Sequence, residues 1–190
     1  MNQISGWYVV AGGPSSGKTT IVNELAKLGY AVYPEASRVL IGGELAKGRK
    51  LEEFQGTIDF QKEIFKLQRE MEEGAPKDKI VFFDRALPEG IAYCRFYGME
   101  IEEYSKKNWA IFKNRYRRIF FCEQLPFDKD NTRIEDDKST RELSRIIREA
   151  YADLDYEIID LPPLPVEERM KIVLNEIGFD KKIKKNNIKI

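Results

Sequence analysis

Residues 7–20 read WYVVAGGPSSGKTT, and this stretch decides the fold of the 190-residue chain. The apolar run Trp7–Ala11 has the length and composition of a buried β-strand, and two glycines end it. Residues Gly12–Thr19 then match the GxxxxGK(S/T) phosphate-binding loop, or P-loop, at every fixed position. An amphipathic helical pattern follows the loop. The order of strand, glycine-rich loop and helix predicts a nucleotide-binding site near the start of the sequence.

The residue types of this loop suit a polyphosphate. Glycines let backbone N–H groups turn toward phosphate oxygens, and the N-terminus of the following helix adds a favourable dipole. We predict that Lys18 bridges the outer phosphates of ATP or GTP and that the Thr19 hydroxyl ligates Mg²⁺. The predicted nucleotide-contacting residues are Gly12, Gly13, Pro14, Ser15, Ser16, Gly17, Lys18, Thr19 and Thr20.

Short apolar strands alternate with helical patterns along the rest of the chain. Beyond the first strand, we expect strands over residues 30–33, 80–83, 118–122 and 156–161. Helical patterns occupy residues 35–74, 91–97, 109–112, 139–154 and 165–177. Strands that are apolar throughout must be covered on both faces, which predicts a three-layer α/β fold with a five-stranded parallel sheet.

The C-terminal half of the sequence predicts where one helix begins and where the domain ends. Ser139 and Glu142 have the spacing of a capping box, so we expect a helix to begin at Ser139. Residues 181–190 contain five lysines and are predicted to form a basic, mobile tail. The sequence therefore predicts a single P-loop domain over residues 1–180.

The composition excludes several classes of function. The 32 basic and 32 acidic side chains cancel to a formal charge of +0, which argues against a nucleic-acid or anionic-membrane binder. The chain has no histidine and two cysteines, so histidine catalysis, histidine metal sites and a disulfide framework are excluded. No apolar run is long enough to span a bilayer, and we expect a cytoplasmic protein. Self-association into homo-oligomers is left open.

Two charged residues follow the most apolar strand. Ligands bind at the carboxyl ends of parallel strands, so Asp84 is predicted to hold the metal together with Thr19. Arg85 is predicted to clamp a donor or acceptor phosphate. The alternatives are that Asp84 caps a helix beginning near Leu87 and that Arg85 pairs with an acid on the surface.

A third charged position follows the second predicted strand. Glu35 is a candidate to accept the proton of an attacking hydroxyl, or to join the magnesium shell. The alternative is an acid that complements a helix dipole. Arg38, one helical turn later, either pairs with Glu35 or helps to hold a substrate anion.

The polar segment 125–138 has the composition of a loop and precedes an arginine-rich helix. We predict that Arg133 and Arg141 belong to a lid that neutralises charge during phosphoryl transfer. Arg145 and Arg148 are better explained as part of a solvated helix face, with pairs such as Glu142 and Arg145.

With these residues in place, the chain resembles the small P-loop proteins of the AAA-domain group of predicted ATPases, which are related to the nicotinamide riboside kinase domain of bacterial NAD biosynthesis. The likeness rests on Gly12–Thr20, Tyr33–Arg38, Val81–Arg85 and residues 133–165. It implies a fold like that of nucleoside and nucleotide kinases. It also implies a base at Glu35 and a metal and phosphate role for Asp84-Arg85. The sequence lacks the arginine finger and helical lid subdomain of ring-forming AAA machines, so no hexameric motor is expected.

Two functions fit these features. The first is a Mg²⁺-dependent phosphotransferase that moves the γ-phosphate of ATP or GTP to a small-molecule hydroxyl or phosphate. Its acceptor would lie between helices of residues 36–74 and 86–114. The second is an ATP- or GTP-binding switch, or slow NTPase, that acts through a protein partner. A defined pocket beside Glu35 favours the kinase, and a filled or collapsed one favours the switch.

Four aromatic residues on these helices are candidates to stack on an acceptor. Their interpretation as ordinary core residues is the stronger one, because large aromatic side chains usually serve packing. The four are Phe54, Phe60, Tyr93 and Tyr97.

Overall fold

The computed structural model describes residues 6–125 and 137–187. Within these residues, five parallel strands form one sheet in the order β2-β3-β1-β4-β5. This arrangement confirms the predicted five-stranded parallel sheet. The strands are β1 (Trp7–Ala11), β2 (Ala31–Tyr33), β3 (Val81–Asp84), β4 (Arg118–Cys122) and β5 (Ile158–Leu161).

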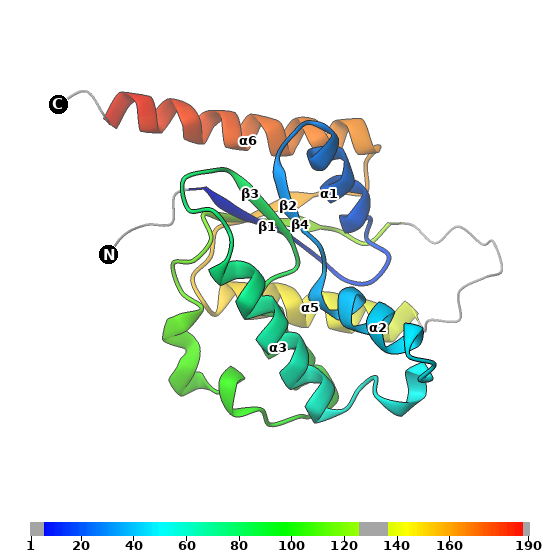
Figure 1. The fold of residues 1–190 in the computed structure, drawn as a ribbon. Coiled ribbons are helices and arrows are strands. Elements are labelled where there is room, and N and C mark those ends of the chain that lie inside the picture. Colours follow the sequence, from blue (N-terminus) through cyan, green and yellow to red (C-terminus); the bar gives the residue numbers. More distant parts are fainter. Residues whose placement is uncertain (1–5, 126–136, 188–190) are drawn as a thin grey trace.

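Helices cover both faces of the sheet (Figure 1). Helices α1 (Lys18–Lys27) and α6 (Val166–Asn187) lie on one face, and α3 (Ile58–Glu73), α4 (Glu89–Tyr97) and α5 (Asp137–Ala152) cover the other. Alternate strand residues pack against the two helical layers. Tyr8 packs on the side of α1 and α6, and Val9 packs on the side of α3, α4 and α5. The apolar strands are thus buried on both faces, as their composition requires.

The predicted helical stretch 35–74 is divided into three elements. They are α2 (Ala36–Ala46), the 3₁₀ turn η1 (Leu51–Glu53) and α3. The breaks contain Gly48 and Gly56, whose φ angles of 82° and 80° belong to the left-handed region. Farther on, the predicted helix 109–112 is also a 3₁₀ segment, η3 (Lys106–Ile111), which follows a shorter one, η2 (Glu102–Tyr104).

Two predicted boundaries in the C-terminal half are wrong. Helix α5 already includes Asp137, so Ser139 lies inside its first turn and is not the N-cap. Helix α6 continues past Ile177 to Asn187, because the lysine-rich segment that follows contains good helix formers and no proline. Residue 180, where the predicted domain ends, lies within this helix, and the division into a domain and a tail stays a prediction. No helix in the described part of the chain has both the length and the apolar character required to cross a membrane.

The strand order places the candidate site. Strand β1 is central, with β3 beside it and β2 beyond β3. Because the strands are parallel, their carboxyl ends lie at one edge of the sheet: Val10 is in register with Asp84, and Tyr33 with Phe83. The P-loop, Asp84-Arg85 and Glu35 therefore leave the sheet side by side.

Candidate active site

The P-loop connects β1 to α1 and is shaped by two glycines. Gly12 has a φ of 138°, and a Cβ atom there would lie 2.5 Å from the Cys122 carbonyl oxygen. Gly17, with a φ of 84°, stands immediately before the first turn of α1. Both positions need the freedom that glycine gives the backbone. The loop thus presents the N-terminus of α1 to an anion.

The Lys18 side chain is buried within this loop. Its Nζ atom donates to the Gly13 carbonyl oxygen at 2.6 Å, and the Ser16 hydroxyl donates to the same oxygen at 2.9 Å. Burial, together with repulsion from the Arg85 guanidinium, lowers the pKa of Lys18 to about 8. A negatively charged ligand at the loop would favour the protonated amine.

Thr19 and Asp84 meet, as the metal-site prediction requires. The Thr19 hydroxyl donates to Asp84 Oδ2 at 3.0 Å. The other carboxylate oxygen, Oδ1, is buried and has no hydrogen-bond partner among the described residues. Burial and the nearby charge of Glu35 raise the pKa of Asp84. Helix α4 begins at Glu89 with Pro88 before it, so the alternative that Asp84 caps this helix is wrong.

Arg85 lies between two carboxylates and is not a surface arginine. Its Nε atom is 3.1 Å from Glu35 Oε1, and its Nη1 atom is 3.1 Å from Glu89 Oε2. Nη1 also donates to the Tyr93 hydroxyl. The guanidinium therefore joins the ends of β2 and β3 to helix α4.

The backbone of Arg85 is strained. Its φ angle of 72° is in the left-handed region, which costs a residue with a Cβ atom about 1–3 kcal/mol. Two hydrogen bonds hold this conformation: Arg85 N–H donates to the Val10 carbonyl at 3.2 Å, and Gln68 Nε2 donates to the Arg85 carbonyl at 3.5 Å. Such strain often marks a functional position.

Glu35 is directed into the site. It is the residue before α2, but its carboxylate makes no capping bond. Instead it accepts from the Ser37 hydroxyl and from Arg38 Nε at 3.2 Å. Burial acts to raise the pKa of Glu35, but Arg85, Ser37 and Lys18 together hold this pKa below its ordinary value. Glu35 is therefore ionised at neutral pH, which is the protonation state that a general base requires.

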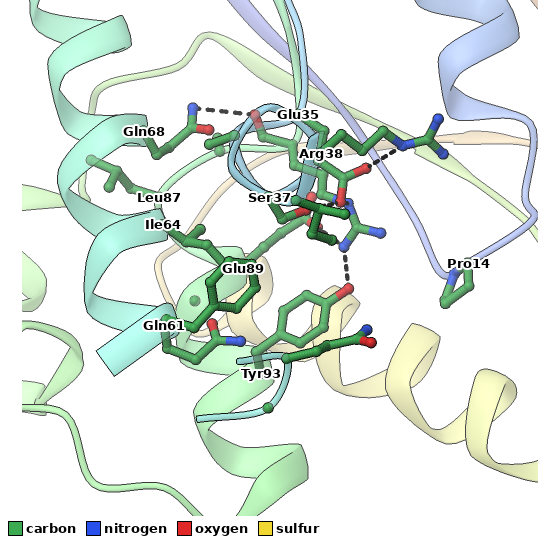
Figure 2. Close-up of a pocket in the computed structure, with 18 of the residues that line it drawn as sticks. Pro14, Glu35, Ser37, Arg38, Gln61, Ile64, Gln68, Leu87, Glu89 and Tyr93 are labelled. Carbon is green, nitrogen blue, oxygen red and sulfur yellow. Dashed lines mark hydrogen bonds and ion pairs between the residues drawn. The ribbon is translucent and has the colours of Figure 1, made fainter. Parts of the chain in front are cut away.

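A cavity of 610 Å³ opens beside Glu35. It runs from the P-loop to residues of α2, α3 and α4, and Figure 2 shows Glu35, Arg38 and Tyr93 around it. Phe60, Tyr93 and Tyr97 line the cavity, whereas Phe54 packs on the Phe60 ring at a centroid distance of 5.1 Å. The lining residues outside the P-loop are Glu35, Ala36, Ser37, Arg38, Ile41, Gln55, Gly56, Phe60, Gln61, Ile64, Gln68, Arg85, Ala86, Leu87, Glu89, Gly90, Tyr93, Tyr97 and Tyr104.

The structure places only one of the two predicted lid arginines. Arg133 lies outside the described residues, and Arg141 is on an exposed part of α5 and does not line the cavity. Arg145 pairs with Glu149 at 2.5 Å instead of with Glu142, and Arg148 pairs with Asp160 of β5. A solvated helix face describes Arg145 and Arg148, as expected.

Sequence reasoning missed two buried charged residues that contact the P-loop or Arg85. Glu89 lies four residues after Arg85, and this spacing could have predicted the ion pair between the two side chains. Arg169 gave no signal, because the start of α6 reads as an ordinary charged helix. It is 2% exposed, and its Nη2 atom donates to the Ser16 carbonyl at 3.0 Å. Among the described residues, no carboxylate lies within ion-pairing distance of its guanidinium. Arg169 of helix α6 thus supports the backbone of the P-loop through the Ser16 carbonyl.

Arg169→Met is expected to weaken nucleotide binding by about tenfold or more, because a bond from a charged donor contributes roughly 1.5–3 kcal/mol. Titration calorimetry with a non-hydrolysable ATP analogue measures this effect. Lys171→Met, an exposed position on the same helix, is the control and should leave the Kd unchanged. An unchanged Kd in a folded Arg169→Met protein would show that the hydrogen bond from Arg169 to Ser16 does not contribute to nucleotide binding.

A family model described as an AAA domain matches residues 7–169. The chain belongs to the AAA domain family. A search of curated proteins found no match for this AAA domain. The matched segment begins at β1 and ends at Arg169, so it includes every described residue of the site.

Solved structures with the same fold include two kinases and the NadR protein. Thymidylate kinase from Ehrlichia chaffeensis has a TM-score of 0.65 and 14% identity, over 90% of this chain and 98% of that one. Deoxyadenosine kinase from M. mycoides, with bound dATP, has a TM-score of 0.60 and 16% identity, over 90% and 99%. NadR, in complex with NAD and AMP-PNP, has a TM-score of 0.64 and 19% identity, over 92% of this chain and 50% of NadR.

These matches establish a P-loop fold of the nucleoside and nucleotide kinase type, as predicted. The family match confirms the predicted AAA-domain group, and this chain, which spans about half of the NadR chain, has the same fold as NadR. At these identities the likeness concerns the fold, and the site residues must carry the functional argument.

Proposed function

We propose that this AAA domain is a Mg²⁺-dependent phosphotransferase that moves the γ-phosphate of ATP or GTP to a small-molecule acceptor. One observation carries the proposal: a single cavity extends from Pro14, Ser15 and Lys18 of the P-loop to Glu35 and Arg85. Its 610 Å³ lies within the usual range of small-molecule sites, about 300–1,000 Å³. Nucleotides bound to similar folds, dATP and AMP-PNP, support the choice of donor.

The residues present fit a magnesium ion. Thr19 offers a hydroxyl and Asp84 a carboxylate, and the buried Oδ1 atom of Asp84 accepts no hydrogen bond from the described residues. Mg²⁺ is commonly held by one or two such side chains plus phosphate oxygens and water. When bound, the ion would neutralise charge on the donor phosphates.

The other residues take the remaining roles. Lys18 would contact the outer phosphates, and Arg85 would stabilise the charge of the transferring group. For a hydroxyl acceptor, Glu35 would take the proton as the oxygen–phosphorus bond forms and the bond to the leaving diphosphate breaks. Arg133 and Arg141 remain proposed lid residues.

The alternative function, a nucleotide-dependent switch, predicts a filled or collapsed pocket. The open cavity beside Glu35 supports the phosphotransferase instead. A cytoplasmic location and self-association stay predictions.

The proposal is tested by following the γ-phosphate. Labelled ATP or GTP is incubated with Mg²⁺, the protein and pooled nucleosides, nucleotides, vitamins and sugars, with Lys18→Ala as the inactive control. We expect label in an organic product that requires Lys18. Label that stays on the nucleotide, or appears only as free phosphate, argues for the switch.

Nucleotide binding is expected to depend on pH through Lys18. Because the pKa of Lys18 is lowered to about 8 and bound phosphates favour its charged form, binding takes up a proton at higher pH. We expect the Kd to be flat below about pH 8 and to rise by up to about tenfold per pH unit above it. Calorimetry in buffers of different ionisation enthalpy measures the proton uptake. Lys18→Arg, which stays charged, should bind nucleotide with a Kd that does not change with pH. A wild-type Kd that is the same below and above about pH 8 would contradict this role of Lys18.

A further inference from the structure

The acidic and basic side chains that line the proposed acceptor cavity pair with one another. Apart from Lys18 of the P-loop, the charged lining residues are Glu35, Glu89, Arg38 and Arg85. Arg85 is shared between both carboxylates at 3.1 Å, and Arg38 pairs with Glu35 at 3.2 Å. A phosphate-bearing acceptor would bring further negative charge next to Glu35 and Glu89. Among the described lining residues, each cation other than Lys18 already has a carboxylate partner, so this arrangement disfavours an anionic acceptor.

A glutamine that lines the same cavity has no hydrogen-bond partner for its side-chain amide among the described residues. Gln61 of α3 is 6% exposed, and Figure 2 shows its side chain reaching toward Tyr93. Among the described residues, its side-chain amide makes no hydrogen bond, whereas the neighbouring Gln68 bonds to Glu72. The amide atoms of Gln61 are open to the cavity, where a ligand can reach them. An amide offers both donors and acceptors, so it matches a ligand whose edge carries both.

Flat apolar walls surround this amide. Tyr93 and Tyr97 stack with a centroid distance of 6.2 Å, and Tyr104 occupies the space that Gly90 leaves free, since a Cβ atom there would overlap its ring. Ile64 lines the cavity one helical turn from Gln61. Aromatic walls beside a side-chain amide favour a planar ring with a hydrogen-bonding edge.

We propose that the acceptor is an uncharged hydroxyl compound that carries a planar heteroaromatic ring, as a nucleoside does, and is not a phosphomonoester. This inference rests on the proposed phosphotransferase function. Gln61 would pair with the ring edge, and the hydroxyl would face Glu35. The hydroxyl oxygen would bond to the transferred phosphorus, its proton would pass to the Glu35 carboxylate, and the nucleoside diphosphate would leave.

The test compares matched acceptors. Purine and pyrimidine nucleosides, each beside its own 5′-monophosphate, are offered with Mg²⁺–ATP, and kcat/KM is measured for each pair. We expect the nucleoside to be preferred by about tenfold or more, the size of effect that an uncompensated charge produces. Equal or better transfer to the monophosphates would overturn the inference but keep the phosphotransferase.

A variant pair tests the amide. Gln61→Met removes the amide with little change in side-chain length and is expected to raise the KM for the nucleoside by about tenfold, with kcat and the KM for ATP little changed. Lys62→Met, the same replacement at the next, exposed position of α3, is the control. An unchanged acceptor KM in Gln61→Met would overturn the role of the amide.

Two outcomes separate the inference from the proposed function. Label on a hydroxyl compound without a ring, such as a sugar, would overturn the inference and leave the phosphotransferase intact. The absence of any labelled acceptor, from a protein that binds ATP, would overturn both.

Discussion

Glu35→Gln is expected to lower the turnover of phosphoryl transfer by about 10²- to 10⁴-fold, the usual contribution of a positioned general base. Glutamine keeps the shape of the side chain but cannot accept a proton. Because Glu35 does not belong to the P-loop, the Kd for nucleotide should stay nearly constant. Steady-state kinetics and calorimetry on the same preparation measure both quantities.

Glu44→Gln is the matched control, because Glu44 belongs to the same helix α2 and pairs with Lys47 and Arg49 away from the cavity. Its turnover should equal that of the wild type. If Glu35→Gln keeps most of its turnover, the assignment of Glu35 as the base is wrong. If the turnover is recovered at high Mg²⁺, Glu35 belongs to the metal shell instead.

Glu72→Ala is expected to destabilise the fold by about 3–5 kcal/mol, the cost of breaking a buried charge pair. Glu72 is fully buried, and one oxygen accepts from Leu87 N–H at 3.1 Å and from the Tyr116 hydroxyl at 2.7 Å. The other oxygen faces Arg115 Nε at 2.9 Å. Removal of the carboxylate leaves these donors without a partner. Thermal unfolding should show a melting temperature lower by roughly 6–20 °C.

Glu73→Ala, one residue along the same helix, provides the comparison. Glu73 is exposed and pairs with Arg69, and such pairs contribute about 0–1 kcal/mol. Similar melting temperatures for the two variants would show that the Glu72 network does not support the fold. Since Leu87 lies in the segment between β3 and α4, we also expect Glu72→Ala to loosen the Arg85 region of the site.

Local patterns predicted the framework of this site. The P-loop motif fixed β1 and α1, and apolar strands followed by acids predicted Glu35 and Asp84 at one sheet edge. This succeeded because parallel pairing brings strand ends together whatever lies between them. The contact between Thr19 and Asp84 joins residues far apart in the sequence, and the topology alone anticipated it.

Buried polar residues on helices could not be predicted in the same way. Arg169, Gln61 and Glu72 have the composition of solvated helix faces, and only packing against other elements shows that they are buried. The breaks at Gly48 and Gly56 were missed for a related reason: helical periodicity continues across them, while the backbone turns. The burial of these side chains and the positions of these breaks depend on contacts with elements that are distant in the sequence, and a local pattern does not contain that information.

The central claim is that the cavity beside Glu35 holds the acceptor of the γ-phosphate. It is tested most directly by blocking the cavity with Ile64→Trp, a change on α3 away from the P-loop. We expect Ile64→Trp to bind nucleotide with the wild-type Kd and to lose transfer of labelled γ-phosphate to the acceptor. Undiminished transfer by this variant would contradict the claim and place the acceptor elsewhere.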